Sequence, residues 1–185
     1  MAMPGLTLPV SRLMTLSDIL DHLITAEGGF VDHPADRGGP TKFGITQATL
    51  AEWRGRSVSV DDVAFLKDAA ASEIYTGRYV LGPRFHQIAD QGVRLFTIDF
   101  GVHSGPARAA RFLQMAANRM GAGLKVDGAV GPVTLGVVNS LNPDRRLRPQ
   151  ISLRMVYLGR LISRDHKQAS FAHGWMRRLA EFVTL

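Results

Sequence analysis

Cysteine is absent from all 185 residues, so the chain has no disulfide framework, no thiolate chemistry and no zinc–thiolate site. The six histidines form neither an HExxH motif nor another closely spaced pair of metal ligands. We therefore expect no metal and no cofactor. If the protein is an enzyme, its chemistry must come from carboxylates, histidine or hydroxyl groups.

Long apolar runs are also missing. No uninterrupted apolar stretch reaches the roughly 20 residues needed to cross a bilayer. The opening segment, MAMPGLTLPVSRLMTLSDIL, lacks the charged start and the apolar run of a signal peptide. We therefore expect synthesis in the cytoplasm. A target outside the membrane would then require another component for export.

Acidic residues are fewer than basic ones, 16 against 22, which gives a formal net charge of +6. This balance favours an anionic partner: nucleic acid, an anionic membrane surface or a phosphate-bearing cell wall. The basic residues stand in small scattered groups, such as Arg145, Arg146 and Arg148, and not in a long run interleaved with aromatic residues. We therefore expect no nucleic acid as a partner.

Apolar residues make up 45% of the chain, enough for one core or two small ones. Their spacing predicts a mainly α fold. Helices are expected at about 16–26, after Thr46, over 67–80 and 107–120, from Pro132 onward, and over 147–180 with a break near Ser170. The run VRLFTIDFGV at 93–102 fits a buried helix or a strand, and its length and helical neighbours favour a helix.

The segment AEGGFVDHPADRGGPTKFGIT, residues 26–46, carries the most functional information. The apolar face of the first expected helix starts at Leu16, and Glu27 lies eleven residues later, about three turns further along that face. A carboxyl directed toward a core is desolvated, which raises its pKa and suits it to donate a proton near neutral pH. A glutamate at a helix end can also simply point to water. Here Gly28 and Gly29 follow, which let the backbone turn sharply and bring a substrate close.

A second carboxylate follows in the glycine-rich loop, and two aspartates compete for its role. Asp36 lies nine residues after Glu27 and can face it across a cleft, whereas Asp32 would more naturally brace the loop. An aspartate in such a segment can also form a turn with its own backbone. Two carboxylates held close together, one against apolar surface and one in a polar turn, can cleave a glycosidic bond.

Further polar side chains are candidates for the same cleft. Thr41 could orient a water, and Thr46 offers a hydroxyl but also fits the cap of the helix that follows it. Asp99 and His103 are one helical turn apart in an apolar segment. They form either a satisfied pair in the core or a contact in a substrate cleft.

These motifs resemble a known family. EGGF at 27–30, DRGGPT at 36–41 and FGIT at 43–46 are similar to the signature of glycoside hydrolase family 108, the N-acetylmuramidases (lysozymes) of phages, prophages and bacteria. The catalytic glutamate of that family matches Glu27, and the step from Glu27 to Asp36 resembles that of phage endolysins with the lysozyme fold. Two positions depart from the family: Phe30 stands where tyrosine is commoner, and His103 stands where asparagine is commoner.

The similarity continues to the C-terminal end, so that it covers about residues 16–185. DGAVGPVT at 127–134 resembles the DGxxGPxT turn of predicted peptidoglycan-binding modules, although turn-to-helix geometry also explains it without a ligand. FAHGWMRRL at 171–179 resembles the Phe-x-x-Gly-Trp-x-x-Arg ending of the same modules. The resemblance implies a lysozyme-like helical fold with a short loop or β-hairpin after the catalytic helix. It also implies a catalytic region over 14–105 and a helical peptidoglycan-binding region over 106–185, packed as one compact unit.

The implied activity is hydrolysis of the β-1,4 bond between N-acetylmuramic acid and N-acetylglucosamine in peptidoglycan. Glu27 would be the general acid, and Asp36 would activate water or stabilise the transition state. The expected substrate contacts are Gly28, Gly29, Phe30, Thr41, Thr46, Asp99 and His103. The expected partners are peptidoglycan and a holin-type pore that allows the protein, expected to be a monomer, to reach the cell wall. Two alternatives are a lytic transglycosylase, which gives a 1,6-anhydro product, and a non-catalytic wall-binding or secretion-associated module.

Overall fold

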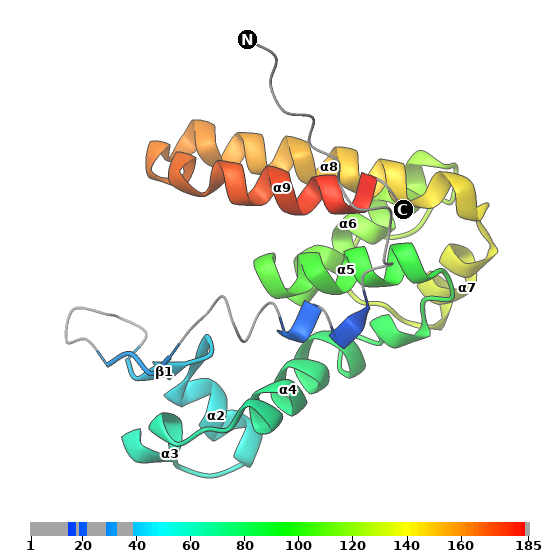
Figure 1. The fold of residues 1–185 in the computed structure, drawn as a ribbon. Coiled ribbons are helices and arrows are strands. Elements are labelled where there is room, and N and C mark those ends of the chain that lie inside the picture. Colours follow the sequence, from blue (N-terminus) through cyan, green and yellow to red (C-terminus); the bar gives the residue numbers. More distant parts are fainter. Residues whose placement is uncertain (1–14, 18, 22–28, 33–38, 184–185) are drawn as a thin grey trace.

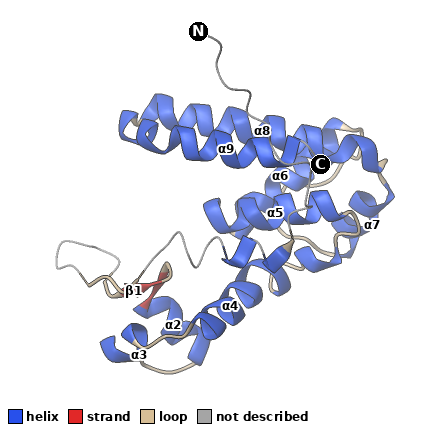
Figure 2. Ribbon diagram, viewed as in Figure 1, coloured by secondary structure: helices blue, strands red, loops and turns tan. Residues whose placement is uncertain are grey.

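A computed structural model of the protein describes residues 15–17, 19–21, 29–32 and 39–183. The described chain is mainly helical, and its strands are confined to one short hairpin (Figure 2). The expected lysozyme-like, mainly α fold with a short hairpin after the first helix is therefore confirmed.

The helices follow one another with short connections. In chain order they are α2 (Gln47–Arg54), α3 (Val60–Ala64), α4 (Asp68–Thr76), the π-helix η1 (Gly77–Leu81), the 3-10 helix η2 (Phe85–Gln87), α5 (Gln91–Ser104), α6 (Pro106–Arg119), α7 (Pro132–Ser140), α8 (Pro143–Arg164), the 3-10 helix η3 (His166–Phe171) and α9 (Ala172–Val183). The run at 93–102 lies inside α5, so the preference for a helix is confirmed. The expected break near Ser170 is η3. The described residues 16, 17 and 19–21 are also helical.

The hairpin consists of β1 (Thr41–Lys42) and β2 (Ile45–Thr46), paired antiparallel. The two residues between the strands, Phe43 and Gly44, have φ angles of 51° and 70°. Left-handed conformations at both central positions are those of a type I′ turn, whose twist matches that of the flanking strands. Two side-chain bonds hold the hairpin: the Tyr75 hydroxyl donates to the Phe43 carbonyl (2.7 Å), and the Lys42 ammonium donates to the Ala64 carbonyl (2.8 Å). The hairpin is thus anchored to α4 and to the end of α3.

Helix α5 organises the core because it lies between two clusters of buried apolar side chains. Leu95 and Phe96 belong to the cluster shared with the hairpin, α4, α8 and α9. Ile98 and Phe100 belong to the cluster shared with η1, η2, α6 and α7. A helix that is apolar on all sides must be enclosed by other elements. Figure 1 shows the result: α8 and α9 lie antiparallel along one side, α5 and α6 lie in the middle, and α4 leads to a lobe made of the hairpin, α2 and α3.

Candidate functional site

Three of the expected site residues, Glu27, Gly28 and Asp36, lie outside the described residues, so their roles stay predictions. The sequence predicts that Glu27 continues the apolar face that starts at Leu16. The structure describes part of that helix, including the turn at residues 19–21. On that turn Ile19 is 1% exposed, and Leu20 packs partly buried against the same cluster. The apolar face is therefore directed into the core over the part of this helix that the structure describes.

The two described ends of the glycine-rich loop lie side by side. Val31 and Thr41 form an isolated antiparallel bridge in which each backbone N–H donates to the other's carbonyl, at 2.8 and 2.9 Å. The Thr41 hydroxyl donates to the Gly39 carbonyl at 3.0 Å. Phe30 and Asp32, next to the bridge, are exposed. The bridge thus fixes the base of the loop and leaves the Phe30 ring accessible to a bound molecule.

Thr46 has a structural role, as the sequence suggested. Its hydroxyl oxygen accepts the Thr49 backbone N–H at 3.2 Å and donates to the Thr49 hydroxyl at 3.1 Å. It is therefore the N-cap of α2, which directly follows the hairpin. By capping α2 it helps to hold β2 opposite Thr41.

Asp99 is fully buried and bound by two arginines. Arg154 of α8, itself 1% exposed, donates to one carboxylate oxygen at 2.6 Å, and Arg178 of α9 donates to the other. The Arg154 guanidinium also lies near the Phe96 and Phe100 rings, with centroid distances of 5.3 and 4.9 Å. Asp99 is therefore satisfied within the core, but its partners are these two arginines and not His103, which the sequence had offered as its pair.

His103 lies one turn after Asp99 but has different partners. Its Nδ1 hydrogen-bonds with the Ser104 hydroxyl at 2.7 Å, and its ring meets the Trp175 ring edge to face, with centroids 5.4 Å apart. The residue as a whole is exposed to solvent. Desolvation by the surrounding protein, followed by repulsion from the Arg154 charge, lowers the pKa of His103 to about 4. The imidazole is therefore neutral at neutral pH and can both donate and accept a hydrogen bond.

This pKa shift predicts a pH dependence of stability. Unfolded His103 takes up a proton near pH 6.5, whereas folded His103 does so only near pH 4. Between these values the unfolded state binds more protons, so the free energy of unfolding falls as the pH falls through this window. The charged groups that face the ring are Asp99 on its own helix, Arg108 of α6, Arg154 of α8 and Arg178 of α9.

We expect His103→Asn to make the loss of stability between pH 6.5 and pH 4 shallower. Urea unfolding of the variant and the unmodified protein at pH 4, 5, 6 and 7 measures this slope. His173→Asn, at an exposed position of α9, is the matched control. If the free energy of unfolding falls equally steeply with pH in the His103 variant and in the unmodified protein, the lowered pKa of His103 is contradicted.

Sequence reasoning missed Arg154 and Arg178 as residues of this region, although a signal was present. Arg154 lies three residues after Ile151 and four before Leu158, both of which are buried. That spacing places an arginine on the apolar face of its helix. Because a buried charge requires an opposite charge, such an arginine predicts a buried carboxylate elsewhere in the chain.

The turn DGAVGPVT at 127–134 is held together from within. The Gln114 side chain donates to the Asp127 carboxylate at 2.8 Å and to the Ala129 carbonyl at 3.0 Å, and it accepts the Gly128 N–H at 3.0 Å. The Asp127 carboxylate thus accepts a bond from the Gln114 side chain and a second one from the Ala129 N–H. These two bonds hold the pKa of Asp127 below its usual range. Gly128 has a φ of +83°, and a Cβ there would lie 2.9 Å from the Ala107 carbonyl oxygen. The motif thus has a structural explanation as the turn that packs against the start of α6.

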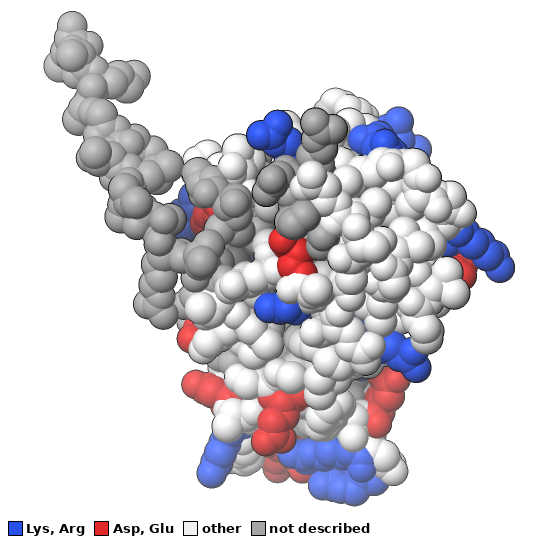
Figure 3. Space-filling view, turned by 90° about the vertical axis from the view of Figure 1, so that its right-hand side faces the viewer, with Lys and Arg blue, Asp and Glu red and all other residues white. Residues whose placement is uncertain are grey.

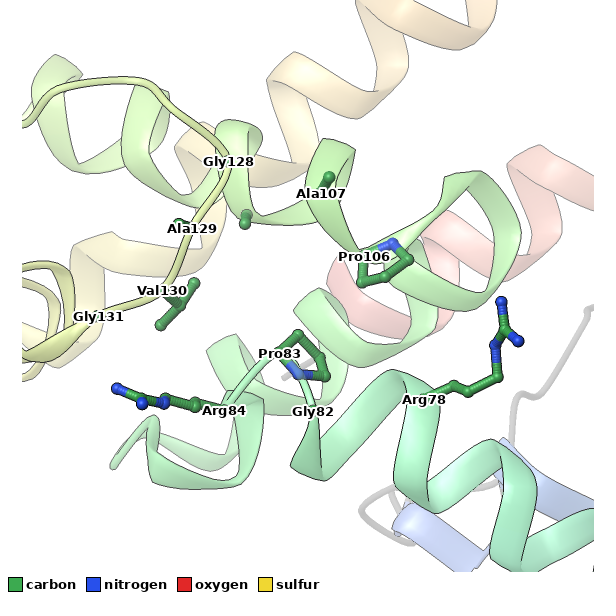
Figure 4. A pocket seen from close by; sticks show the side chains of 11 residues that line it. Arg78, Gly82, Pro83, Arg84, Pro106, Ala107, Gly128, Ala129, Val130 and Gly131 are labelled. Carbon is green, nitrogen blue, oxygen red and sulfur yellow. The ribbon is translucent and has the colours of Figure 1, made fainter. Parts of the chain in front are cut away.

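A cavity of about 500 Å³ lies between this turn, the start of α6 and the segment after η1. Figure 4 shows Pro83, Pro106 and Val130 around it, with Arg78 and Arg84 at opposite ends and directed away from one another. Arg78 is already paired with Glu52 at 2.6 Å. Among the described residues, no Asp, Glu or His lines this cavity. Its described lining therefore lacks the groups for acid–base chemistry.

The surface shows no single basic stripe on the face drawn in Figure 3, where lysine and arginine side chains lie in separate groups around an uncharged area. Among the described residues, no cluster of three or more histidine or acidic side chains could hold a metal ion. None of the described helices combines the length and the apolar character needed to cross a membrane.

Comparisons with known proteins match both parts of the chain. Residues 20–105 match the family model of glycosyl hydrolase 108, and residues 108–180 match a predicted peptidoglycan domain. A search of curated proteins found no match. Among solved structures, that of SagA from Brucella abortus is similar, with 35% sequence identity, coverage of 90% of each chain and a TM-score of 0.68.

Proposed function

Because this chain belongs to the glycosyl hydrolase 108 family and is a peptidoglycan hydrolase, we propose that it is an N-acetylmuramidase. It cleaves the β-1,4 bond between N-acetylmuramic acid and N-acetylglucosamine, with Glu27 as general acid. The observation that carries this proposal is the complete EGGF motif at 27–30, which lies inside the matched region and follows in sequence the helical residues 19–21, where Ile19 is buried.

The expected mechanism needs one proton donor and one charged partner. Glu27, whose sequence position predicts a desolvated carboxyl, protonates the oxygen of the leaving sugar. Asp36 activates water or stabilises the oxocarbenium-like transition state. The separation of the two carboxyls decides the stereochemistry: roughly 6.5–9.5 Å corresponds to inversion and about 5–5.5 Å to retention.

The remaining predicted contacts have different parts in this proposal. Phe30, exposed beside the bridge between Val31 and Thr41, offers a ring to the sugar, and Gly29 lets the substrate approach. The Thr41 hydroxyl borders the same loop. His103 contacts substrate through its neutral ring. Asp99 acts indirectly, by holding α8 and α9 against α5.

The two matched regions are proposed to work as one compact unit. Asp99 belongs to the first region, and both of its arginines belong to the second. The second region then keeps peptidoglycan close to the catalytic loop. The net charge of +6 supports retention on anionic wall polymers, an attraction that added salt weakens. A phage or prophage origin, passage through a holin-type pore and a monomeric state complete the proposal, on the basis of the sequence.

Product analysis tests the proposed bond specificity. We expect purified peptidoglycan treated with the protein to release fragments with N-acetylmuramic acid at a free reducing end, detected by mass spectrometry before and after borohydride reduction. Fragments ending in 1,6-anhydro-N-acetylmuramic acid, together with retained activity in Asp36→Ala, would identify a lytic transglycosylase. Binding to insoluble peptidoglycan without release of soluble sugar would identify a non-catalytic module.

A further inference from the structure

An aromatic cluster formed by His103, Phe171 and Trp175 lies where the end of α5 meets η3 and the start of α9. The Phe171 and Trp175 rings stack, with centroids 6.0 Å apart and planes 25° from parallel. Trp175 also meets the His103 ring edge to face, with centroids 5.4 Å apart. Phe171 and Trp175 are the two aromatic residues of the FAHGWMRRL motif.

The core does not account for this arrangement. Phe171 is 57% exposed and belongs to neither buried cluster, whereas Trp175 is half-buried and packs against the first cluster. The neighbouring Met176 is 39% exposed. The Phe171 ring, stacked on the packed Trp175 ring, leaves apolar surface exposed to water, which is energetically unfavourable. Contiguous apolar surfaces of this kind mark binding sites.

The same motif also contains an arginine that has a clear structural role. Arg178 donates to the buried Asp99 carboxylate of α5, which ties α9 to the helix that carries His103. The motif therefore combines one residue that fixes the helix with a partly buried ring, Trp175, and an exposed ring, Phe171. Arg178 thus has a structural role, whereas the exposed Phe171 ring belongs to neither buried cluster, and this difference indicates that the rings bind a ligand.

We propose that His103, Phe171 and Trp175 form a sugar-binding subsite that stacks on a ring of the glycan strand. The inference rests on the proposed function, because it takes peptidoglycan as the substrate. One face of an N-acetylhexosamine ring presents C–H groups with partial positive charge, which match the negative π-face of an aromatic ring. The neutral His103 and the Ser104 hydroxyl beside it supply hydrogen-bonding groups for the polar edge of the sugar.

The position of the cluster agrees with a subsite on the substrate strand. Figure 1 shows that the end of the molecule where α8 turns into α9 lies on the same side as the β1–β2 hairpin. That hairpin follows directly after the glycine-rich loop, and Phe30 is exposed at the base of the loop. A polymeric glycan can contact surfaces well separated from the bond that is cleaved, and such contacts add affinity without taking part in the chemistry.

The test uses binding of a tetramer of N-acetylglucosamine, measured by titration calorimetry on chains that also carry Glu27→Gln to prevent cleavage. We expect Phe171→Ala to raise the Kd by roughly 5–10-fold, as the loss of one aromatic contact implies. Phe171→Tyr keeps the ring and should bind as tightly as the parent chain. Phe65→Ala removes a phenylalanine that is 79% exposed elsewhere on the surface, and it should leave the Kd unchanged.

Fluorescence locates the bound sugar. The chain contains two tryptophans, and Trp53→Phe leaves Trp175 as the only one. We expect saturable quenching of its emission by the tetramer, with the same Kd as in calorimetry. In the cleaving enzyme, Phe171→Ala should raise KM for peptidoglycan while kcat stays within about twofold, the sign of a contact equally strong in ground and transition states.

Two outcomes overturn the subsite: equal Kd values for the parent and Phe171→Ala, or an equal loss of affinity in Phe65→Ala. Failure of the proposed function looks different. Anhydro products in the cleavage assay would reject the muramidase while the binding data stand. Free reducing ends combined with an unchanged Kd in Phe171→Ala would reject the subsite alone.

Discussion

Glu27→Gln is expected to reduce the release of soluble sugar from purified peptidoglycan by roughly 10²–10⁴-fold, the usual contribution of a general acid. Glutamine preserves the size and polarity of the side chain but cannot donate a carboxyl proton. The expected position, three turns along the face that starts at Leu16, makes this proton available near neutral pH because burial raises the pKa of a carboxyl. Release of reducing sugar over time, with matched protein concentrations, measures the effect.

The matched control is Glu73→Gln, the same substitution at an exposed position of α4. It should keep full activity, and both variants should unfold within about 2 °C of the unmodified protein. If Glu27→Gln releases sugar as fast as the unmodified protein, the assignment of Glu27 as the general acid is contradicted. The same loss in both variants would show that the assay responds to surface charge and not to a proton donor.

Elements with local causes could be predicted from the sequence. The length of the run at 93–102 and its helical neighbours favoured a helix, and the structure places this run inside α5. Pro132 was expected to begin a helix, and it is the first residue of α7. Thr46 was recognised as a cap because its hydroxyl needs only a backbone N–H three residues away. In each case the interacting groups are close in the chain.

Long-range pairing could not be predicted in the same way. The sequence offered His103 as the partner of Asp99 because the two are one turn apart. In the structure the partners of Asp99 are Arg154 and Arg178, 55 and 79 residues away in the chain. The spacing around Arg154 marks it as inward-facing, but no local pattern pairs Arg154 or Arg178 with Asp99, since that pairing depends on how α8 and α9 pack against α5. Likewise, the contact between Trp175 and His103 follows from this packing and not from either motif alone.

Asp99→Asn is expected to lower the free energy of unfolding by about 3–5 kcal/mol, the usual cost of breaking a buried ion pair. The variant keeps nearly the same volume but removes the one negative charge that is bonded to Arg154 among the described residues; the Arg154 side chain is 1% exposed. Arg154 cannot reach water, so its charge would remain buried without compensation. Urea unfolding at neutral pH measures the loss, and the thermal midpoint should fall by roughly 6–20 °C.

The ion pair between Glu52 and Arg78 is the matched control, because it has the same N–O distance of 2.6 Å but Glu52 is 73% exposed. Glu52→Gln should cost only about 0–1 kcal/mol. Equal costs for Glu52→Gln and Asp99→Asn would show that burial does not set the importance of the Asp99 cluster. The double variant Asp99→Leu with Arg154→Met removes both buried charges, and we expect it to regain much of the lost stability. Its remaining defect would then measure the bond from Arg178, which is 19% exposed and holds α9, with Trp175, against α5.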